Sequence, residues 1–129
     1  MSEADIERIK VGLAAFGERD FDLILELMEE DAEVQRLGGA ETLRGKEAIR
    51  SWLEPDAIEY QQATPTEFRE NGNRVLVSCD WRVRGTGSKI EVEARIFLVY
   101  TLRGERITRI QAFQDEIEAL EATGLSEQA

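Results

Sequence analysis

The spacing of the apolar residues changes near residue 57 of this 129-residue chain, and this change most constrains the fold. Before it, apolar side chains recur every three or four residues, as in Ile6, Ile9 and Leu13, which is the spacing of an amphipathic helix. After it they alternate with other residues, as in "RVLVSCDWRV", which is the spacing of a strand. The sequence therefore predicts an α+β domain, with helices first and antiparallel strands afterwards.

The first part of the chain is expected to hold three helices, at residues 3–16, 21–28 and 46–53, and a short strand at 32–37. A long polar strand should follow from Ala57, and Pro65 places it at a sheet edge, because proline cannot donate to a neighbouring strand. Asp115 should cap a last short helix that ends at Gly124. We expect a single domain over residues 1–129, with its core at about 3–125.

Composition excludes several classes of function. The net charge of −11 repels nucleic-acid phosphates and anionic lipid, so neither nucleic acid nor membrane is expected as a partner. Histidine is absent, which removes the commonest general base and the commonest metal ligand, and we expect neither a metal nor a cofactor. Cys79 is the only cysteine and cannot form an internal disulfide, so a cytoplasmic location is expected.

Three stretches in order, "ERDFDLILELMEEDAEV", "LRGKEAIRSWL" and "GERITRIQAFQDEIEALEATGL", resemble the SnoaL-like (polyketide cyclase-like) family. This family lies in the nuclear transport factor 2-like superfamily, with the ketosteroid isomerases. The resemblance implies a cone: three N-terminal helices packed on a strongly bent antiparallel sheet, with a short C-terminal helix across the rim. It also implies a deep pocket for a small, largely apolar ligand.

A homodimer through the outer face of the sheet is also usual in the family. The stretch from Ile96 to Tyr100 supports it, because this strand is apolar on both faces and the three helices can cover only one of them. A partner subunit would cover the other face.

The active sites of two related enzyme groups are not retained. Arg36, Gly12 and Phe97 stand where ketosteroid isomerases have an Asp base, a Tyr donor and a protonated Asp. Arg95 matches the arginine of epoxide hydrolases, but Phe97 and Ala112 replace their two Asp residues. We therefore expect neither proton shuttling nor water activation of these kinds.

SnoaL-type cyclases use an acidic side chain at the pocket end of a strand, and two residues are candidates for this role. Asp115 is either such an acid–base or the N-cap of the last helix. Asp80 is either an acid–base or a solvated carboxylate paired with Arg82 or Arg84.

The expected ligand-binding residues combine aromatic side chains with arginines. Arg36 either anchors an anionic ligand or extends from the strand end to water. The aromatic residues are either pocket wall or ordinary core. The full set is Phe16, Arg36, Trp52, Trp81, Arg95 and Phe97. Three functions remain open: ligand binding without an assigned reaction, catalysis of cyclase, isomerase or hydratase type, and protein–protein adaptation.

Overall fold

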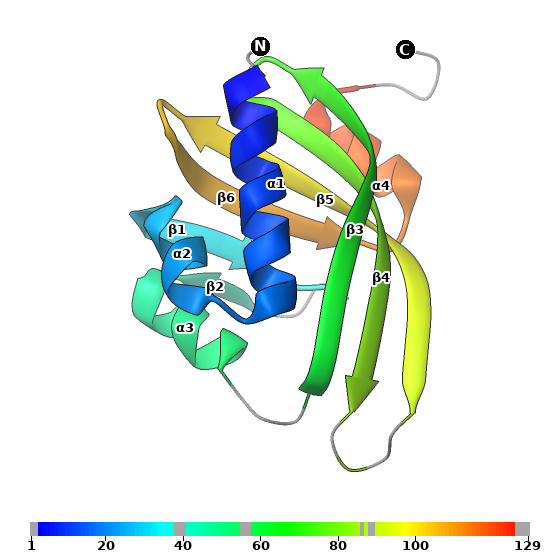
Figure 1. The fold of residues 1–129 in the computed structure, drawn as a ribbon. Coiled ribbons are helices and arrows are strands. Elements are labelled where there is room, and N and C mark those ends of the chain that lie inside the picture. Colours follow the sequence, from blue (N-terminus) through cyan, green and yellow to red (C-terminus); the bar gives the residue numbers. More distant parts are fainter. Residues whose placement is uncertain (1–2, 38–40, 55–57, 86, 88–89, 126–129) are drawn as a thin grey trace.

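The computed structural model describes residues 3–37, 41–54, 58–85, 87 and 90–125 (Figure 1). Within these ranges none of the helices is long and apolar enough to cross a bilayer. In chain order the elements are α1 (Glu3–Glu18), α2 (Phe21–Glu26), β1 (Met28–Gln35), β2 (Thr42–Arg44), α3 (Lys46–Leu53), β3 (Ile58–Asn71), β4 (Arg74–Gly85), β5 (Glu91–Arg103), β6 (Arg106–Phe113) and α4 (Glu116–Thr123).

The described strands form one sheet in the order β2-β1-β6-β5-β4-β3. Strand β3 lies at an edge, as Pro65 predicted. Register shifts interrupt the pairing in β3 between Pro65 and Glu67, and in β5 between Thr101 and Leu102. Such irregularities bend strands, and the long strands curve around α1 (Figure 1).

One strand pair differs from the antiparallel sheet expected from the sequence. Strand β1 runs parallel to β6, with Val34 opposite Ile110, while the other pairs are antiparallel. Hairpin connections fix β3 to β6 as antiparallel neighbours. No hairpin joins β1 to β6, because β2 to β5 lie between them in the chain, so local sequence did not determine the direction of this pair.

The second helix is shorter than predicted. It ends at Glu26, and Met28 already belongs to β1, so the expectation of a helix through residue 28 was wrong. The Ile107 N–H donates to the Leu27 carbonyl at 2.9 Å, which ties the end of this turn to β6. Pairing with a distant strand thus overrides the helical spacing of the local sequence.

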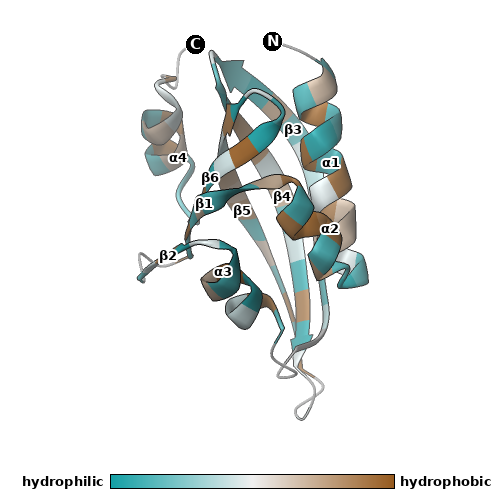
Figure 2. Ribbon diagram, turned by 90° about the vertical axis from the view of Figure 1, so that its left-hand side faces the viewer, coloured by the Kyte–Doolittle hydropathy of each residue, from teal (hydrophilic) through white to brown (hydrophobic). Residues whose placement is uncertain are grey.

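Helices α1, α2 and α3 cover the concave face of the sheet, and α4 lies on the opposite face (Figure 2). The main core lies between the first three helices and the sheet, and contains Ile9, Leu13, Ile49, Val75 and Val77. Their burial follows from both spacings, because one stripe of each helix meets alternate residues of the strands.

Helix α4 corrects two expectations from the sequence. It does not fold across the rim: Ala119 and Leu120 pack with Leu76, Phe97 and Val99 on the outer face of β4 and β5. The apolar outer side of the central strand is therefore covered within the chain. This apolar face therefore does not require a partner subunit to cover it.

Candidate functional site

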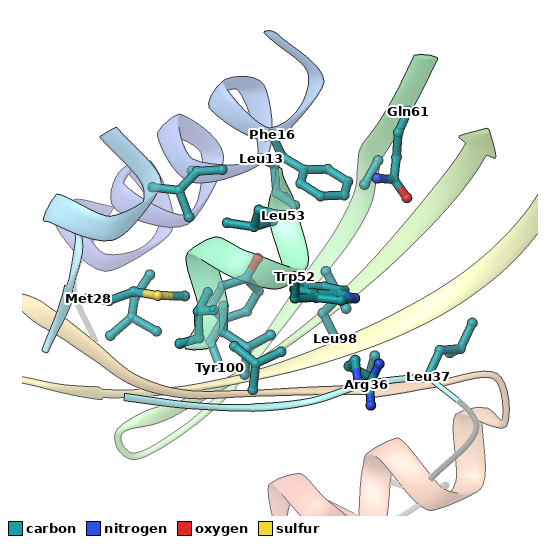
Figure 3. A pocket seen from close by; sticks show the side chains of 18 of the residues that line it. Leu13, Phe16, Met28, Arg36, Leu37, Trp52, Leu53, Gln61, Leu98 and Tyr100 are labelled. Carbon is teal, nitrogen blue, oxygen red and sulfur yellow. The ribbon is translucent and has the colours of Figure 1, made fainter. Parts of the chain in front are cut away.

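A cavity of about 450 Å³ lies between the three N-terminal helices and the concave face of the sheet. This volume falls within the range of small-molecule sites. Most of its wall is apolar, with side chains from both layers that include Leu13, Ile24, Leu53, Ile96 and Leu98. Figure 3 shows Phe16 and Gln61 on one side of the cavity and Arg36 and Leu37 on the other, with Trp52 between them.

The cavity has a deep end and a mouth. Met28, Tyr100 and Ile107 line the deep end and are at most 5% exposed. Arg19, Arg36 and Trp52 line the mouth, where Trp52 is 40% exposed. A ligand would therefore enter past two arginines and an indole and reach a closed apolar interior.

Arg36 is one of the two cationic groups that the described residues bring to the cavity wall. It follows the last residue of β1, and its Nε donates to the Glu41 carbonyl at 3.4 Å. Its Nη1 and Nη2 nitrogens have no partner among the residues that the structure describes. The guanidinium is thus positioned from its inner nitrogen, and its outer donors remain available to an acceptor oxygen.

Arg19 is the second cation at the mouth. It adopts a left-handed backbone conformation, with φ of 58°, directly after α1. Its Nη2 donates to the Glu54 carbonyl at 3.3 Å, and its guanidinium lies 5.0 Å from the centre of the Phe21 ring. These contacts link the ends of α1 and α3 and hold a positive charge beside the opening.

Gln61 and Trp81 form a polar pair in the cavity wall. The Trp81 Nε1–H donates to Gln61 Oε1 at 2.9 Å, between the neighbouring strands β3 and β4. This bond uses one of the two lone pairs of the amide oxygen, and the NH₂ group of Gln61 can donate to a further acceptor.

Tyr100 lies at the deep end, on the central strand β5. Its side chain projects into the cavity, as Figure 3 shows. Burial raises the pKa of the Tyr100 phenol well above its usual range, and the neighbouring Cys79 raises it further. The hydroxyl therefore keeps its proton at neutral pH and can donate it in a hydrogen bond.

Four of the six predicted ligand-binding residues line the cavity: Phe16, Arg36, Trp52 and Trp81. Phe97 does not, and the prediction that it would line the cavity was wrong. Successive residues of a strand point to opposite faces, so Ile96 and Leu98 face the cavity and Phe97 faces α4.

Arg95 also lies outside the cavity. It shares the outer face with Phe97, and its Nη2 is 3.1 Å from Asp80 Oδ1 on the neighbouring strand. Asp80 thus pairs with Arg95, and not with Arg82 or Arg84 as the sequence suggested. Both members of the pair are more than half exposed, so this is a surface ion pair on the wrong face for a ligand in the cavity.

Asp115 caps α4, because its carboxylate accepts from the Ile117 N–H at 2.9 Å. It is exposed and does not line the cavity. Neither candidate acid–base from the sequence therefore reaches the cavity. Among the described residues, no Asp or Glu lines it, and no group of three or more His, Cys, Asp or Glu could hold a metal ion.

The sequence offered no reason to single out Arg19 or Gln61, and one sequence alone does not give the direction of the Tyr100 and Tyr60 side chains. The alternation in β3 carried one signal, since Gln61 and Ala63 share a face and both line the cavity. Tyr60 points the other way and bonds Gln62 on the surface. Nothing in the local sequence could have identified Arg19, because its place depends on how the end of α1 meets α3.

The family model of the SnoaL-like domain matches residues 12–110. None of the curated proteins compared with the chain matches it significantly in sequence. A crystal structure of TerC, co-crystallised with polyporic acid, is 26% identical, with a TM-score of 0.74 over 95% of this chain and 99% of that chain.

Two further solved structures share the fold. A protein from Catenulispora acidiphila with a ketosteroid isomerase-like fold, in complex with trimethylamine, is 22% identical, with a TM-score of 0.75 over 95% of this chain and 96% of that chain. SalBIII, described as an epoxide hydrolase/cyclase-like enzyme with a role in pyran ring formation in salinomycin, is 20% identical, with a TM-score of 0.78 over 86% of this chain and 90% of that chain.

These likenesses confirm the α+β cone predicted from the sequence, with the one parallel strand pair as its correction. The family model spans most of the chain, from within α1 to within β6. The protein belongs to the SnoaL-like domain family.

Proposed function

We propose that the protein binds a small, largely apolar molecule that carries an anionic oxygen, and that Arg36 holds this oxygen at the mouth of the cavity. The observation that carries the proposal is the outer end of the Arg36 guanidinium, which bonds no other described residue and lies beside an apolar cavity. A guanidinium next to apolar surface gains most from a carboxylate or enolate oxygen, because such a pair is both charged and hydrogen-bonded.

The cavity wall supports an apolar body for this ligand. Phe16, Trp52 and Trp81 bring aromatic surface to the cavity, and Leu53 and Leu98 add aliphatic surface. TerC, which is 26% identical over nearly the whole chain, was co-crystallised with polyporic acid, and this compound is a reasonable first probe here.

The other two functions have less support. Catalysis by Asp80 or Asp115 would need a carboxylate at the cavity, and each is engaged elsewhere, in an ion pair with Arg95 and in the cap of α4. An adaptor role would need an apolar docking surface, and no observation favours one. A homodimer through the outer face would have to form over α4 and the exposed ion pairs beside it, so we do not include it in the proposal.

Tryptophan fluorescence tests the proposal directly, because both tryptophans of the chain line the cavity. Anthracene carboxylate and its methyl ester have the same apolar body and differ in charge. We expect the carboxylate to bind more tightly, and Arg36→Ala to weaken its binding about 10- to 100-fold while leaving the ester nearly unchanged.

Arg95→Ala is the matched control, because it also removes one arginine but lies on the outer face. Its affinity for the carboxylate should stay close to that of the unmodified protein. Equal binding of carboxylate and ester, or an equal loss for both in Arg36→Ala, would contradict the proposal. Calorimetric titration of the same pairs gives a readout that does not depend on the probes' own absorption.

A further inference from the structure

Most of the polar groups that the described residues present to the cavity are hydrogen-bond donors. Arg19 and Arg36 can only donate, and the amide oxygens of Gln61 and Gln35 each already accept one bond, from Trp81 and Gln111. Tyr100 adds a protonated hydroxyl at the deep end. The cavity therefore offers donors at both ends, and no carboxylate among the described lining residues would attract a cation or an amine.

Tyr100 is the least expected of these donors. Its side chain is 5% exposed, yet no hydrogen bond joins its hydroxyl to any other residue in the described part of the chain. The hydroxyl itself is not enclosed by protein atoms, because it faces the cavity (Figure 3), where a water molecule or a ligand oxygen can pair with it. A ligand that displaced this water without replacing its hydrogen bond would leave the hydroxyl unpaired, at a cost of about 1–3 kcal/mol.

We propose that the Tyr100 hydroxyl is a second anchor for the ligand, and that the ligand is an apolar molecule with two acceptor oxygens. An anionic oxygen would lie at Arg36 in the mouth and a carbonyl oxygen, of a ketone or quinone, at Tyr100 in the deep end. The inference rests on the proposed function, because it takes the orientation of the ligand from Arg36. It goes further by naming the ligand class as apolar keto acids or acidic quinones.

The walls between the two anchors are consistent with a flat ligand body. Ile96 and Leu98 form one wall beneath Trp52 and Leu53 of α3, and the indole N–H of Trp52 is the one polar group among these four side chains. A ligand without the second oxygen would leave the Tyr100 hydroxyl unpaired. Discrimination should therefore be strong, because a site built around a buried donor rejects ligands that lack its acceptor.

Pairs of probes that differ in one group can test this. Para-benzoylbenzoate and para-(phenylvinyl)benzoate have the same shape, with C=O in the first where the second has C=CH₂. Acetylbiphenyl carboxylate and its isopropenyl counterpart form a longer pair with the same difference. In the pair whose length fits the cavity, we expect the ketone to bind about five- to tenfold more tightly than the alkene.

Tyr100→Phe keeps the ring and removes only the hydroxyl. It should abolish the ketone preference, because the ketone loses its donor and the alkene no longer leaves a hydroxyl unpaired. Its midpoint of thermal unfolding should not fall, because the hydroxyl bonds none of the other described residues. Tyr60→Phe is the control, since Tyr60 bonds Gln62 outside the cavity, and it should keep the full ketone preference.

The outcomes separate this inference from the proposed function. If ketone and alkene of both pairs bind equally while Arg36→Ala still weakens both, the Tyr100 anchor is wrong and the Arg36 site stands. A ketone preference that survives in Tyr100→Phe would also overturn the anchor. If none of the four carboxylates binds, the proposed function fails and this inference fails with it.

Discussion

The Asn71 side chain donates a hydrogen bond to the Thr123 carbonyl at 2.7 Å and so joins the end of β3 to the end of α4. Thr123 is fully buried, and its hydroxyl donates to the Ala119 carbonyl within the helix. Gly124 follows with a left-handed φ of 81° and ends α4. This contact fixes the C-terminal end of the helix against the turn between β3 and β4.

Gly124→Ala should therefore destabilise the protein by two separate effects. An added Cβ is strained at this φ and would lie 2.7 Å from the Asn71 amide nitrogen, so this amide must shift and its bond to Thr123 is weakened. We expect a loss of about 2 kcal/mol in the free energy of unfolding, measured by urea denaturation. Gly72→Ala is the control, because Gly72 has a φ of 62° but open space around its Cβ position. It should lose about half as much, and equal losses would show that the contact contributes nothing.

Asp115→Ala should affect stability and not ligand binding. The carboxylate caps α4 through the Ile117 N–H, and losing such a cap costs about 1 kcal/mol. Asp115→Ser should recover most of this loss, because a serine hydroxyl can accept the same bond. Urea denaturation and ligand titration of both variants provide the measurements. A lost affinity in Asp115→Ser with normal stability would restore Asp115 as a functional residue.

Stability should fall as the pH rises above 9, because of Cys79. Burial raises the pKa of its thiol from 9.0 to about 12, with a smaller contribution from Asp80. Between these values the unfolded chain releases the proton and the folded chain keeps it, so alkali favours unfolding. We expect a slope approaching about 1 kcal/mol per pH unit, read from urea midpoints at a series of pH values from neutral to mildly alkaline. Cys79→Ala should flatten this slope, and an unchanged slope would assign it to other groups.

The chain should be monomeric at micromolar concentration, since α4 already covers Phe97 and Val99. Sedimentation or native mass spectrometry would give the mass of one chain. A dimer would instead indicate pairing over the exposed ion pairs around Asp80 and Arg95, and added salt should then dissociate it, because exposed ion pairs are screened.

The local sequence patterns predicted most of the secondary structure, and each error has an identifiable physical cause. Residues 46–53 were placed correctly because one apolar stripe runs the length of that helix. The predicted end of the helix near Met28 was wrong because the backbone there pairs with β6, which is far away in the chain. Strand β2 was missed because three residues carry too little periodicity to be recognised.

At the site, the sequence indicated which types of residue would line the cavity, but not the direction in which each side chain points. Trp52 and Arg36 lie in the cavity wall, although the sequence left open whether each was a cavity residue. Phe97 could not be placed, since β5 is apolar on both faces and only the position of α4 distinguishes them. For the same reason the direction of Tyr100 required the structure.

The parallel pairing of β1 with β6 also has a consequence for synthesis of the chain on the ribosome. Residues 28–35 are made early, but their central neighbour β6 begins only at Arg106. Until then β1 has an unpaired edge, and the first three helices have an incomplete sheet beneath them. Contacts of such long sequence separation form slowly, so the nascent chain depends on its last strand to close the cavity around whatever it binds.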